Sequence, residues 1–204
     1  MSKTTFSVLI ATVIAIVAVV GLFLTTTDSK FGEKKRTFSD LGGDFTLDSK
    51  KGPISLTDYR GKVVILYFGF LTCPEVCPNS MAVVKNALNK LTAEQLRSTR
   101  AILVSVDPRR DSLDDLAEFA SFYHDNLVGV TGSQQQIKRI TDQYGAYYDI
   151  EEIGSGAQDY GIEHSSRYYV IDPVGNLIAA MRHSTTPNEL RAQIAQVLNG
   201  RSET

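Results

Sequence analysis

Cysteine is scarce in this sequence, and neither sign of charge is in large excess. The 204 residues include two Cys, 21 basic and 23 acidic residues, with a formal net charge of -2. Two cysteines cannot build the disulfide scaffold of a small secreted protein. An isoelectric point of about 5.9 argues against binding of nucleic acid through bulk positive charge. The length allows one domain, or at most two small ones.

Charge is absent from residues 6–24, FSVLIATVIAIVAVVGLFL. A helix of this length spans about 28 Å, close to the roughly 30 Å hydrocarbon core of a bilayer. A cleaved signal peptide is the alternative, but its apolar region normally covers only about 7–15 residues, and TTTDSK after the run is a poor cleavage site. We therefore expect a cytoplasmic N-terminus (1–5), a retained transmembrane anchor (6–24), a polar tether (25–40) and one domain (41–200).

The order of apolar segments in the domain predicts an α/β fold. Alternating residues predict hairpins, continuous apolar runs predict buried strands, and helical periodicity lies between them. The expected elements are a hairpin at 45–56, a strand at 62–70, a helix after Pro78, a strand at 101–106, a helix from Ser112, a strand at 127–130, a helix at 137–144, a hairpin at 167–182 and a helix between Thr186 and Gly200. Such alternation implies an α/β sheet with an antiparallel hairpin at one side.

Both cysteines follow the first buried strand, in the segment GFLTCPEVCP. Folds of this class place ligands at the C-terminal ends of strands. Cys73 and Cys77 are spaced so that one helical turn would put both sulfurs on one face, and the helix N-terminus would favour thiolates. The pair suits thiol–disulfide exchange, a soft metal such as Cu(I), or an internal disulfide. A purely structural bridge or two inert thiols are the alternative, and such a bridge would close only a tiny loop.

Three segments together resemble the Sco/SenC family: CPEVCP after the first buried strand, VDPRRD after the second, and YGIEHSSRYYVIDPVGN further on. The resemblance covers roughly residues 38–199. It implies a membrane-tethered protein with a thioredoxin-like fold, and together with the apolar run and the alternating residues it predicts an N-terminal transmembrane helix and an added N-terminal β-hairpin on that fold. It also implies one copper ion per chain, as Cu(I) or Cu(II), with Cys73, Cys77 and His164 as ligands. His164 would then lie in a loop before a late strand, after the Gly-containing stretch 154–161.

The resemblance implies a metallochaperone that delivers copper to, and helps mature, the binuclear copper site of cytochrome c oxidase. Expected partners are the copper-site subunit of the oxidase, other copper chaperones, and a periplasmic thioredoxin-like reductant that keeps the thiols reduced. The expected location is the bacterial inner (plasma) membrane, crossed once, with the C-terminal domain in the periplasm or outside the cell. The positive-inside rule does not by itself favour this orientation, because Lys34, Lys35 and Arg36 follow the apolar run.

A thiol–disulfide oxidoreductase that reduces the copper-site cysteines of the oxidase subunit is the alternative, so the sequence leaves open whether the protein is an enzyme. Oxidoreductases of the thioredoxin type generally have CxxC and a proline before the late strand, whereas this chain has CxxxC and HSSR. A peroxidase related to peroxiredoxins would share the fold but would leave His164 without a role.

Two acidic residues of VDPRRD, Asp107 and Asp111, match positions near the family's copper site. Partner contact or redox tuning is one interpretation, and turn formation or helix capping is the other. Thr72 stands where many family members have a His. That difference concerns redox tuning or partner choice rather than the three ligands.

Three further residues are weaker candidates for copper ligands. We expect His124 at the end of a helix, where a solvated or dipole-stabilising role is usual. We expect His183 to be exposed at a strand end, and Met81 to pack in the core because of its helical phase.

Overall fold

The computed structural model describes residues 12–18, 37–152, 156 and 160–200, and the chain divides into two units, residues 1–37 and 38–204. In the first unit, residues 12–18 form a helix. No helix among the described residues is long and apolar enough to cross a membrane. The remainder of the expected anchor, 6–24, lies outside the described residues, as does most of the expected tether.

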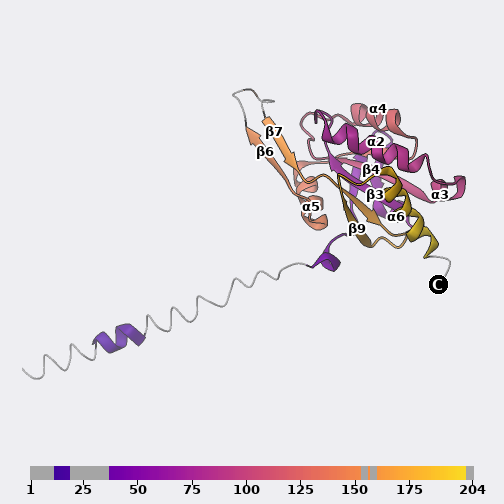
Figure 1. The fold of residues 1–204 in the computed structure, drawn as a ribbon. Helices are drawn as coiled ribbons and strands as arrows, with labels where there is room; N and C mark the ends of the chain where they lie inside the picture. The colour runs from indigo at the N-terminus through magenta and orange to yellow at the C-terminus, as the bar shows by residue number, and fades with distance from the viewer. Residues whose placement is uncertain (1–11, 19–36, 153–155, 157–159, 201–204) are drawn as a thin grey trace, which may run out of the picture. The chain divides into compact units, whose positions relative to one another are not determined.

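The second unit contains all the other helices and strands that the structure describes (Figure 1). With η for 3₁₀ helices, they are η1 (Phe38–Asp40), β1 (Thr46–Ser49), β2 (Gly52–Ser55), η2 (Leu56–Tyr59), β3 (Val63–Gly69), α2 (Val76–Leu88), α3 (Ala93–Arg97), β4 (Thr99–Ser105), α4 (Leu113–Tyr123), β5 (Leu127–Val130), α5 (Gln134–Tyr144), β6 (Tyr148–Glu152), β7 (Tyr160–His164), β8 (Arg167–Ile171), β9 (Leu177–Arg182) and α6 (Pro187–Asn199).

A five-stranded mixed sheet forms the centre of this unit, in the order β5-β4-β3-β8-β9. Strands β3, β4 and β5 are parallel, and β8 and β9 are added antiparallel. Every residue of β3 is buried, as a strand covered on both faces requires. The register of β3 with β4 pairs Gly69 with Ser105, so the segments that follow both strands leave the sheet side by side.

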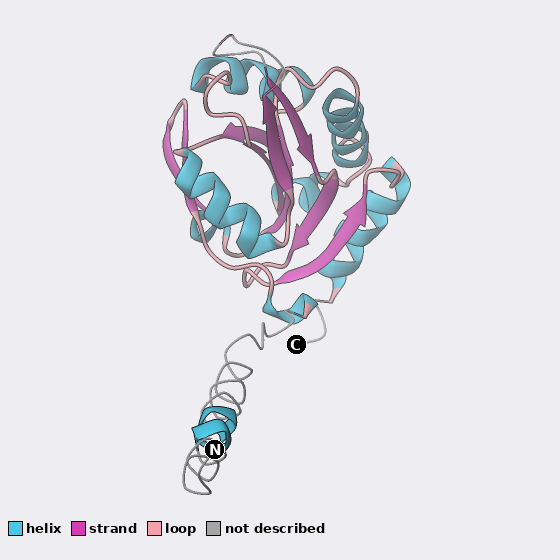
Figure 2. Ribbon diagram, turned by 90° about the vertical axis from the view of Figure 1, so that its left-hand side faces the viewer, coloured by secondary structure: helices cyan, strands magenta, loops and turns pink. Residues whose placement is uncertain are grey.

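Helices cover both faces of the sheet (Figure 2). On one face α2 packs against α4 and α6, and the Tyr168 hydroxyl donates to the Ser80 carbonyl of α2 at 3.4 Å. On the other face Tyr144 of α5 packs against Phe68 and Tyr169, with ring centroids 6.0 and 5.9 Å apart. Successive residues of a strand point to opposite faces of the sheet. Phe68 and Tyr169 therefore pack against α5, while Tyr168, next to Tyr169, faces α2.

The predicted α/β order is correct for the main sheet, and the N-terminal hairpin β1–β2 is present. The structure adds the short helix α3 and the strand β6, which were not predicted, and it corrects the segment that carries His164. Residues 160–164, expected as part of a loop, form β7, which pairs antiparallel with β6. His164 is therefore the last residue of a strand, not a loop residue.

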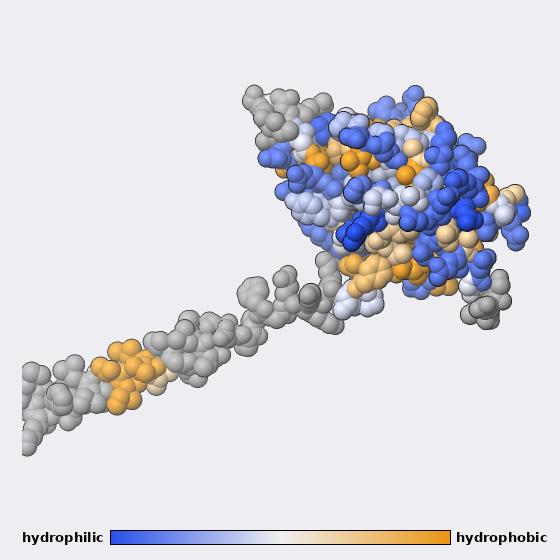
Figure 3. Space-filling view, in the orientation of Figure 1, coloured by the Kyte–Doolittle hydropathy of each residue, from blue (hydrophilic) through white to orange (hydrophobic). Residues whose placement is uncertain are grey.

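The face of the domain seen in Figure 3 is mainly hydrophilic, with smaller apolar areas between the polar ones.

Candidate metal centre

The two cysteines lie where β3 gives way to α2. Cys73 lies in the intervening turn, where its N–H donates to the Phe70 carbonyl at 3.4 Å, and Cys77 lies in the first turn of α2. A helical turn holding both sulfurs was therefore the wrong prediction, since α2 begins only at Val76. Pro78 fits inside the helix because the first turn needs no N–H donor.

Cys73, Cys77 and His164 nevertheless meet in space. One possible ligand atom from each residue lies within 4.8 Å of the other two. The Cys77 Sγ and His164 Nε2 atoms are 3.5 Å apart, although 87 positions separate them in the sequence. Both cysteines are free thiols. The structure thus brings together all three residues that the family resemblance nominates.

A glycine makes room for the Cys77 thiol. A Cβ atom built on Gly69 would stand 2.9 Å from Cys77 Sγ, closer than real Cβ contacts come, and 3.0 Å from the Tyr67 ring, which is a very tight contact. The rings of Tyr67 and Phe70 pack edge-on against the His164 imidazole, with centroids 6.3 and 5.5 Å away. These aromatic contacts and Gly69 were not predicted from the sequence, where they read only as parts of a buried strand.

Burial dominates the electrostatics of the cluster. Cys77 is 1% exposed, and burial raises the pKa of its thiol to about 12, with the Cys73 sulfur adding to the effect. The expectation that the helix N-terminus favours a thiolate is therefore wrong for Cys77 in the metal-free chain. Burial also lowers the pKa of His164, which keeps the imidazole neutral and able to coordinate a metal. A soft cation would have to displace the Cys77 proton.

The cluster opens to the surface through a pocket of about 380 Å³. Cys73 and His164 line it, whereas Cys77 lies behind them. Two apolar side chains of the lining are themselves exposed, Val76 by 38% and Tyr147 by 57%. An incoming ligand or protein would reach Cys73 and His164 first.

Asp111 ties the cysteine-bearing turn to the neighbouring loop. Its Oδ2 accepts the Leu71 N–H at 3.0 Å and the Ser105 hydroxyl at 2.6 Å. Asp111 is 3% exposed, and burial raises its pKa. The helix cap expected in this segment is supplied by Ser112, whose hydroxyl accepts the Asp115 N–H of α4.

Asp107 is also buried and fully engaged. Its Oδ1 accepts the Tyr160 hydroxyl at 2.5 Å, and its Oδ2 pairs with the Arg110 Nε. The side chain is 1% exposed, so in this conformation its carboxylate faces the domain interior. Tyr160 belongs to the same strand as His164. Its role was not predicted from the sequence, and nothing in the local pattern signals a link across 53 positions.

None of the three weaker candidates lines the opening to the cluster. Met81 is buried in the core, and His183 is exposed. His124 follows α4 as its C-cap, and its Nδ1 accepts the Asn126 N–H at 2.8 Å. Thr72 is exposed beside Cys73.

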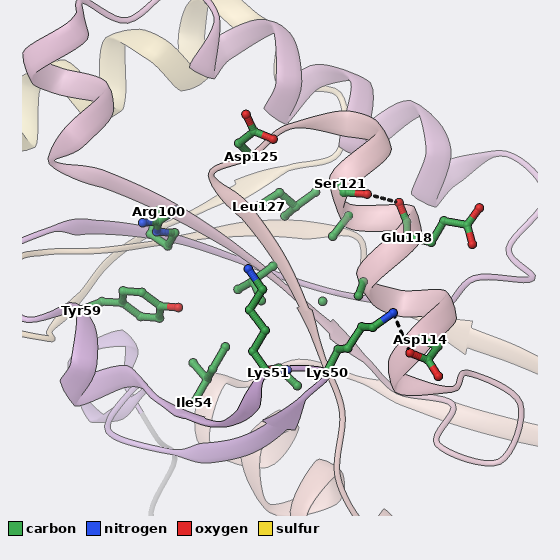
Figure 4. A pocket seen from close by; sticks show the side chains of 15 residues that line it. Lys50, Lys51, Ile54, Tyr59, Arg100, Asp114, Glu118, Ser121, Asp125 and Leu127 are labelled. Carbon is green, nitrogen blue, oxygen red and sulfur yellow. Dashed lines mark hydrogen bonds and ion pairs between the residues drawn. The ribbon is translucent and has the colours of Figure 1, made fainter.

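A larger cavity, of about 730 Å³, lies between the β1–β2 hairpin, η2, α4 and β5 (Figure 4). Charged side chains of both signs line it, including the ion pair of Lys50 Nζ with Asp114 at 2.8 Å. Its lining residues include no cysteine or histidine. The soft-metal chemistry of the chain therefore belongs to the smaller opening.

The sheet order, the flanking helices and a Cys-Cys-His cluster at the end of the central strand define a thioredoxin-like domain with a candidate soft-metal site. The SCO1/SenC family profile matches residues 33–199, and the chain belongs to this family. Protein SCO2, mitochondrial, from Saccharomyces cerevisiae is 34% identical over 142 residues, which are 69% of this chain and 47% of the yeast protein. The chain thus spans about half the length of that relative.

Solved structures support the same assignment. Yeast Sco1 with copper bound superposes with a TM-score of 0.71 at 27% identity, covering 81% of this chain and 95% of the other. BsSco, a member of the Sco family of cytochrome c oxidase assembly proteins in which a disulfide switch is identified, superposes with a TM-score of 0.64 at 26% identity, covering 83% and 98%. The resemblance and the thioredoxin-like fold expected from the sequence are confirmed.

Proposed function

We propose that this chain is a membrane-anchored copper metallochaperone that serves the binuclear copper site of cytochrome c oxidase. The observation that carries the proposal is the convergence of Cys73, Cys77 and His164 within 4.8 Å. Yeast Sco1, a structural relative, holds copper, and BsSco belongs to a family of oxidase assembly proteins. In this proposal Asp107 and Asp111 are not ligands. Asp111 holds the cysteine-bearing turn through Leu71, and Asp107 holds Tyr160 on the strand of His164.

The chemistry of the three residues suits copper as cargo. Two thiolates favour Cu(I), and one imidazole helps to retain Cu(II). Each thiol releases its proton when its sulfur binds the ion. Cys73 and His164 line the opening while Cys77 does not. Transfer therefore begins with a partner thiolate replacing Cys73 or His164, and Cys77 leaves the ion last.

Location and partners follow from the same proposal. Residues 6–24 anchor the chain in the bacterial plasma membrane, residues 25–40 form the tether, and the domain 41–200 faces the periplasm or the cell exterior. In that oxidising compartment free thiols need a reductant, and a periplasmic thioredoxin-like protein fits this need. Other copper chaperones would supply the ion, and the copper-site subunit of the oxidase would receive it. A periplasmic reporter enzyme fused to the C-terminus should be active, and an inactive fusion contradicts this orientation.

Copper titration of the full chain in mild detergent tests the proposal. The reduced protein should bind one Cu(I) or one Cu(II) per chain, and His164→Ala should weaken Cu(II) binding by roughly tenfold or more. His183→Ala is the matched control, because His183 is exposed and does not line the opening to the cluster. Equal copper binding by wild-type and His164→Ala protein, together with rapid disulfide reduction, would overturn the chaperone assignment.

A thiol–disulfide oxidoreductase remains the second candidate, because both thiols are free and lie within 4.8 Å. Cys73 lines the opening, so its sulfur would attack a partner disulfide and form a mixed disulfide. Cys77 would then attack Cys73, releasing the partner as a dithiol and leaving the Cys73–Cys77 disulfide. This activity predicts that Cys77→Ser traps the mixed disulfide with a model disulfide substrate, and absence of a trapped adduct counts against it.

A further inference from the structure

The strand that carries His164 is not part of the main sheet. Among the described strands, β7 pairs only with β6, in a two-stranded sheet of its own. The backbone ladder of the central sheet therefore does not fix where this hairpin lies against the cysteines. Residues 165 and 166 join the His164 end of β7 to β8, so the side-chain contacts of the hairpin matter most at its Tyr160 end.

Tyr160 and His164 occupy opposite ends of one face of β7. They are four residues apart, and alternate residues of a strand point to the same side. At about 3.3 Å per residue, roughly 13 Å separates them along the strand. Tyr160 is buried, and Glu163, on the other face, is exposed. The inner face of the strand thus presents His164 to the cysteines at one end and Tyr160 to the loop 107–110 at the other.

The Tyr160 hydroxyl and carbonyl are both engaged with that loop. The Tyr160 hydroxyl donates to Asp107 at 2.5 Å, and the Tyr160 carbonyl accepts an Arg110 N–H at 3.1 Å. The guanidinium carbons of Arg110 and Arg109 lie 3.8 and 4.5 Å from the centroid of the Tyr160 ring. Arg110 also pairs with the Asp107 carboxylate. Residues of this loop therefore hold both the carbonyl and the side chain of Tyr160.

We propose that Tyr160, held by Asp107 and Arg110, is a positioning residue that sets where β7 presents His164 to the two cysteines. The same loop holds the cysteine side of the site, because Asp111 accepts the Leu71 N–H. The loop between β4 and α4 therefore contacts both the cysteine-bearing turn and the strand that carries His164. This inference rests on the copper site proposed above.

The variant Tyr160→Phe tests the role, since it removes one hydroxyl and keeps the ring over the arginines. We expect Cu(II) affinity of the full chain to fall about tenfold, as for other residues that orient a metal-ligating histidine. The nitrogen hyperfine signal of bound Cu(II) should weaken, while Cu(I) affinity, which rests on the thiolates, should change much less. In the metal-free protein, amide exchange at residues 160–164 should speed up.

Tyr144→Phe is the matched control, because it also removes a buried hydroxyl, which donates to the Gly43 carbonyl at 2.8 Å. It should leave both the copper spectrum and exchange of β7 unchanged. Asp107→Ala should lower Cu(II) affinity less in the Tyr160→Phe variant than in the wild type. The reason is that both substitutions break the same hydrogen bond, between the Tyr160 hydroxyl and Asp107.

Wild-type affinity and spectra in Tyr160→Phe, or an equal change in Tyr144→Phe, would overturn the positioning role. Failure of the wild-type chain to bind copper would instead overturn the proposed function. In that case the exchange of β7 amides still shows whether Tyr160 holds the strand.

Discussion

Gly69 shows how the absence of a side chain serves the metal centre. Its missing Cβ is the space that the Cys77 sulfur occupies, at 2.9 Å from where that atom would be. We expect Gly69→Ala to displace the Cys77 thiol or the Tyr67 ring and to lower copper affinity by roughly tenfold, the scale of effects seen when a metal site is disturbed. Copper titration and circular dichroism together measure the site and the fold.

Gly200→Ala is the control for this change. A Cβ on Gly200 would meet its nearest atoms at 3.6 and 3.8 Å, which are ordinary contacts. It should bind copper like the wild type. Undiminished copper binding by Gly69→Ala would contradict this prediction, because it would mean that the Cys77 thiol can move aside without loss of the site.

His124 gives the stability of the domain a defined pH dependence. Burial lowers the pKa of His124, with the positive charges of Lys85 and Arg100 adding to the effect and Asp125 opposing it. Its folded pKa is then below the unfolded value of about 6.5. The neutral ring, which accepts the Asn126 N–H, stabilises the fold above that unfolded pKa, and the stabilisation is lost as pH falls from there through the folded pKa.

His124→Ala should therefore lower the free energy of unfolding by about 0.5–1.5 kcal/mol at neutral pH, the value of one hydrogen bond. The gap between wild type and variant should narrow at about pH 5, because the wild type progressively loses this stabilisation below the unfolded pKa of about 6.5. Urea unfolding at both pH values measures it, with His183→Ala as the control. A gap that widens on acidification contradicts the sign of the shift.

At the scale of elements, Asp111 joins the segments that leave β3 and β4. Replacing it by Ala would leave the Leu71 N–H and the Ser105 hydroxyl without their acceptor. We expect a loss of about 1–3 kcal/mol in the free energy of unfolding, the cost of leaving buried polar groups unpaired. Copper affinity should fall as well, because Leu71 leads into the cysteine-bearing turn.

Asp114→Ala is the matched control for Asp111→Ala, since Asp114 pairs with Lys50 at the surface and its side chain is 77% exposed. Surface pairs contribute about 0–1 kcal/mol, so urea unfolding should change little. Equal stability losses in both variants would show that the buried link adds nothing.

The elements that the sequence predicts well are those with a single strong pattern. Apolar runs locate β3, β4 and β5, and the capping residue Thr186 locates the start of α6. The hairpin β6–β7 was missed, although Tyr160, Ile162 and His164 alternate as a strand should. The glycines between the two strands favoured a loop, and the pairing itself is a tertiary event.

The metal site also has a part that the sequence alone predicts and a part that depends on the folded structure. The spacing of Cys73 and Cys77 is local and readable, so the pair stands out in the sequence alone. His164 has no such signal, because it reaches Cys77 only through folding across 87 positions, and the family resemblance was needed to nominate it. The raised pKa of Cys77 could not be predicted either, since it depends on the finished burial of the sulfur.

At the scale of the whole molecule, the proposed site joins the central sheet and the separate β6–β7 hairpin. A metal held by all three residues would fix the hairpin against β3 and α2 more firmly than side-chain packing does. The unfolded chain can offer copper the local cysteine pair, but bringing His164 to it costs loop-closure entropy. The share of copper affinity that comes from His164 is therefore specific to the folded state.

Copper should accordingly raise the thermal stability of the full chain, and His164 should account for part of the gain. At a copper concentration about 100-fold above the dissociation constant, linkage predicts about 2.7 kcal/mol, or a Tm increase of roughly 5–11 °C. His164→Ala should show a clearly smaller increase at the same copper concentration, and Cys73→Ser with Cys77→Ser should show none. Differential scanning calorimetry of the wild type and both variants, with and without Cu(II), measures the increase. An undiminished increase in the double serine variant would place copper elsewhere in the chain, while an equal increase in His164→Ala would mean that the histidine takes no part in holding the ion.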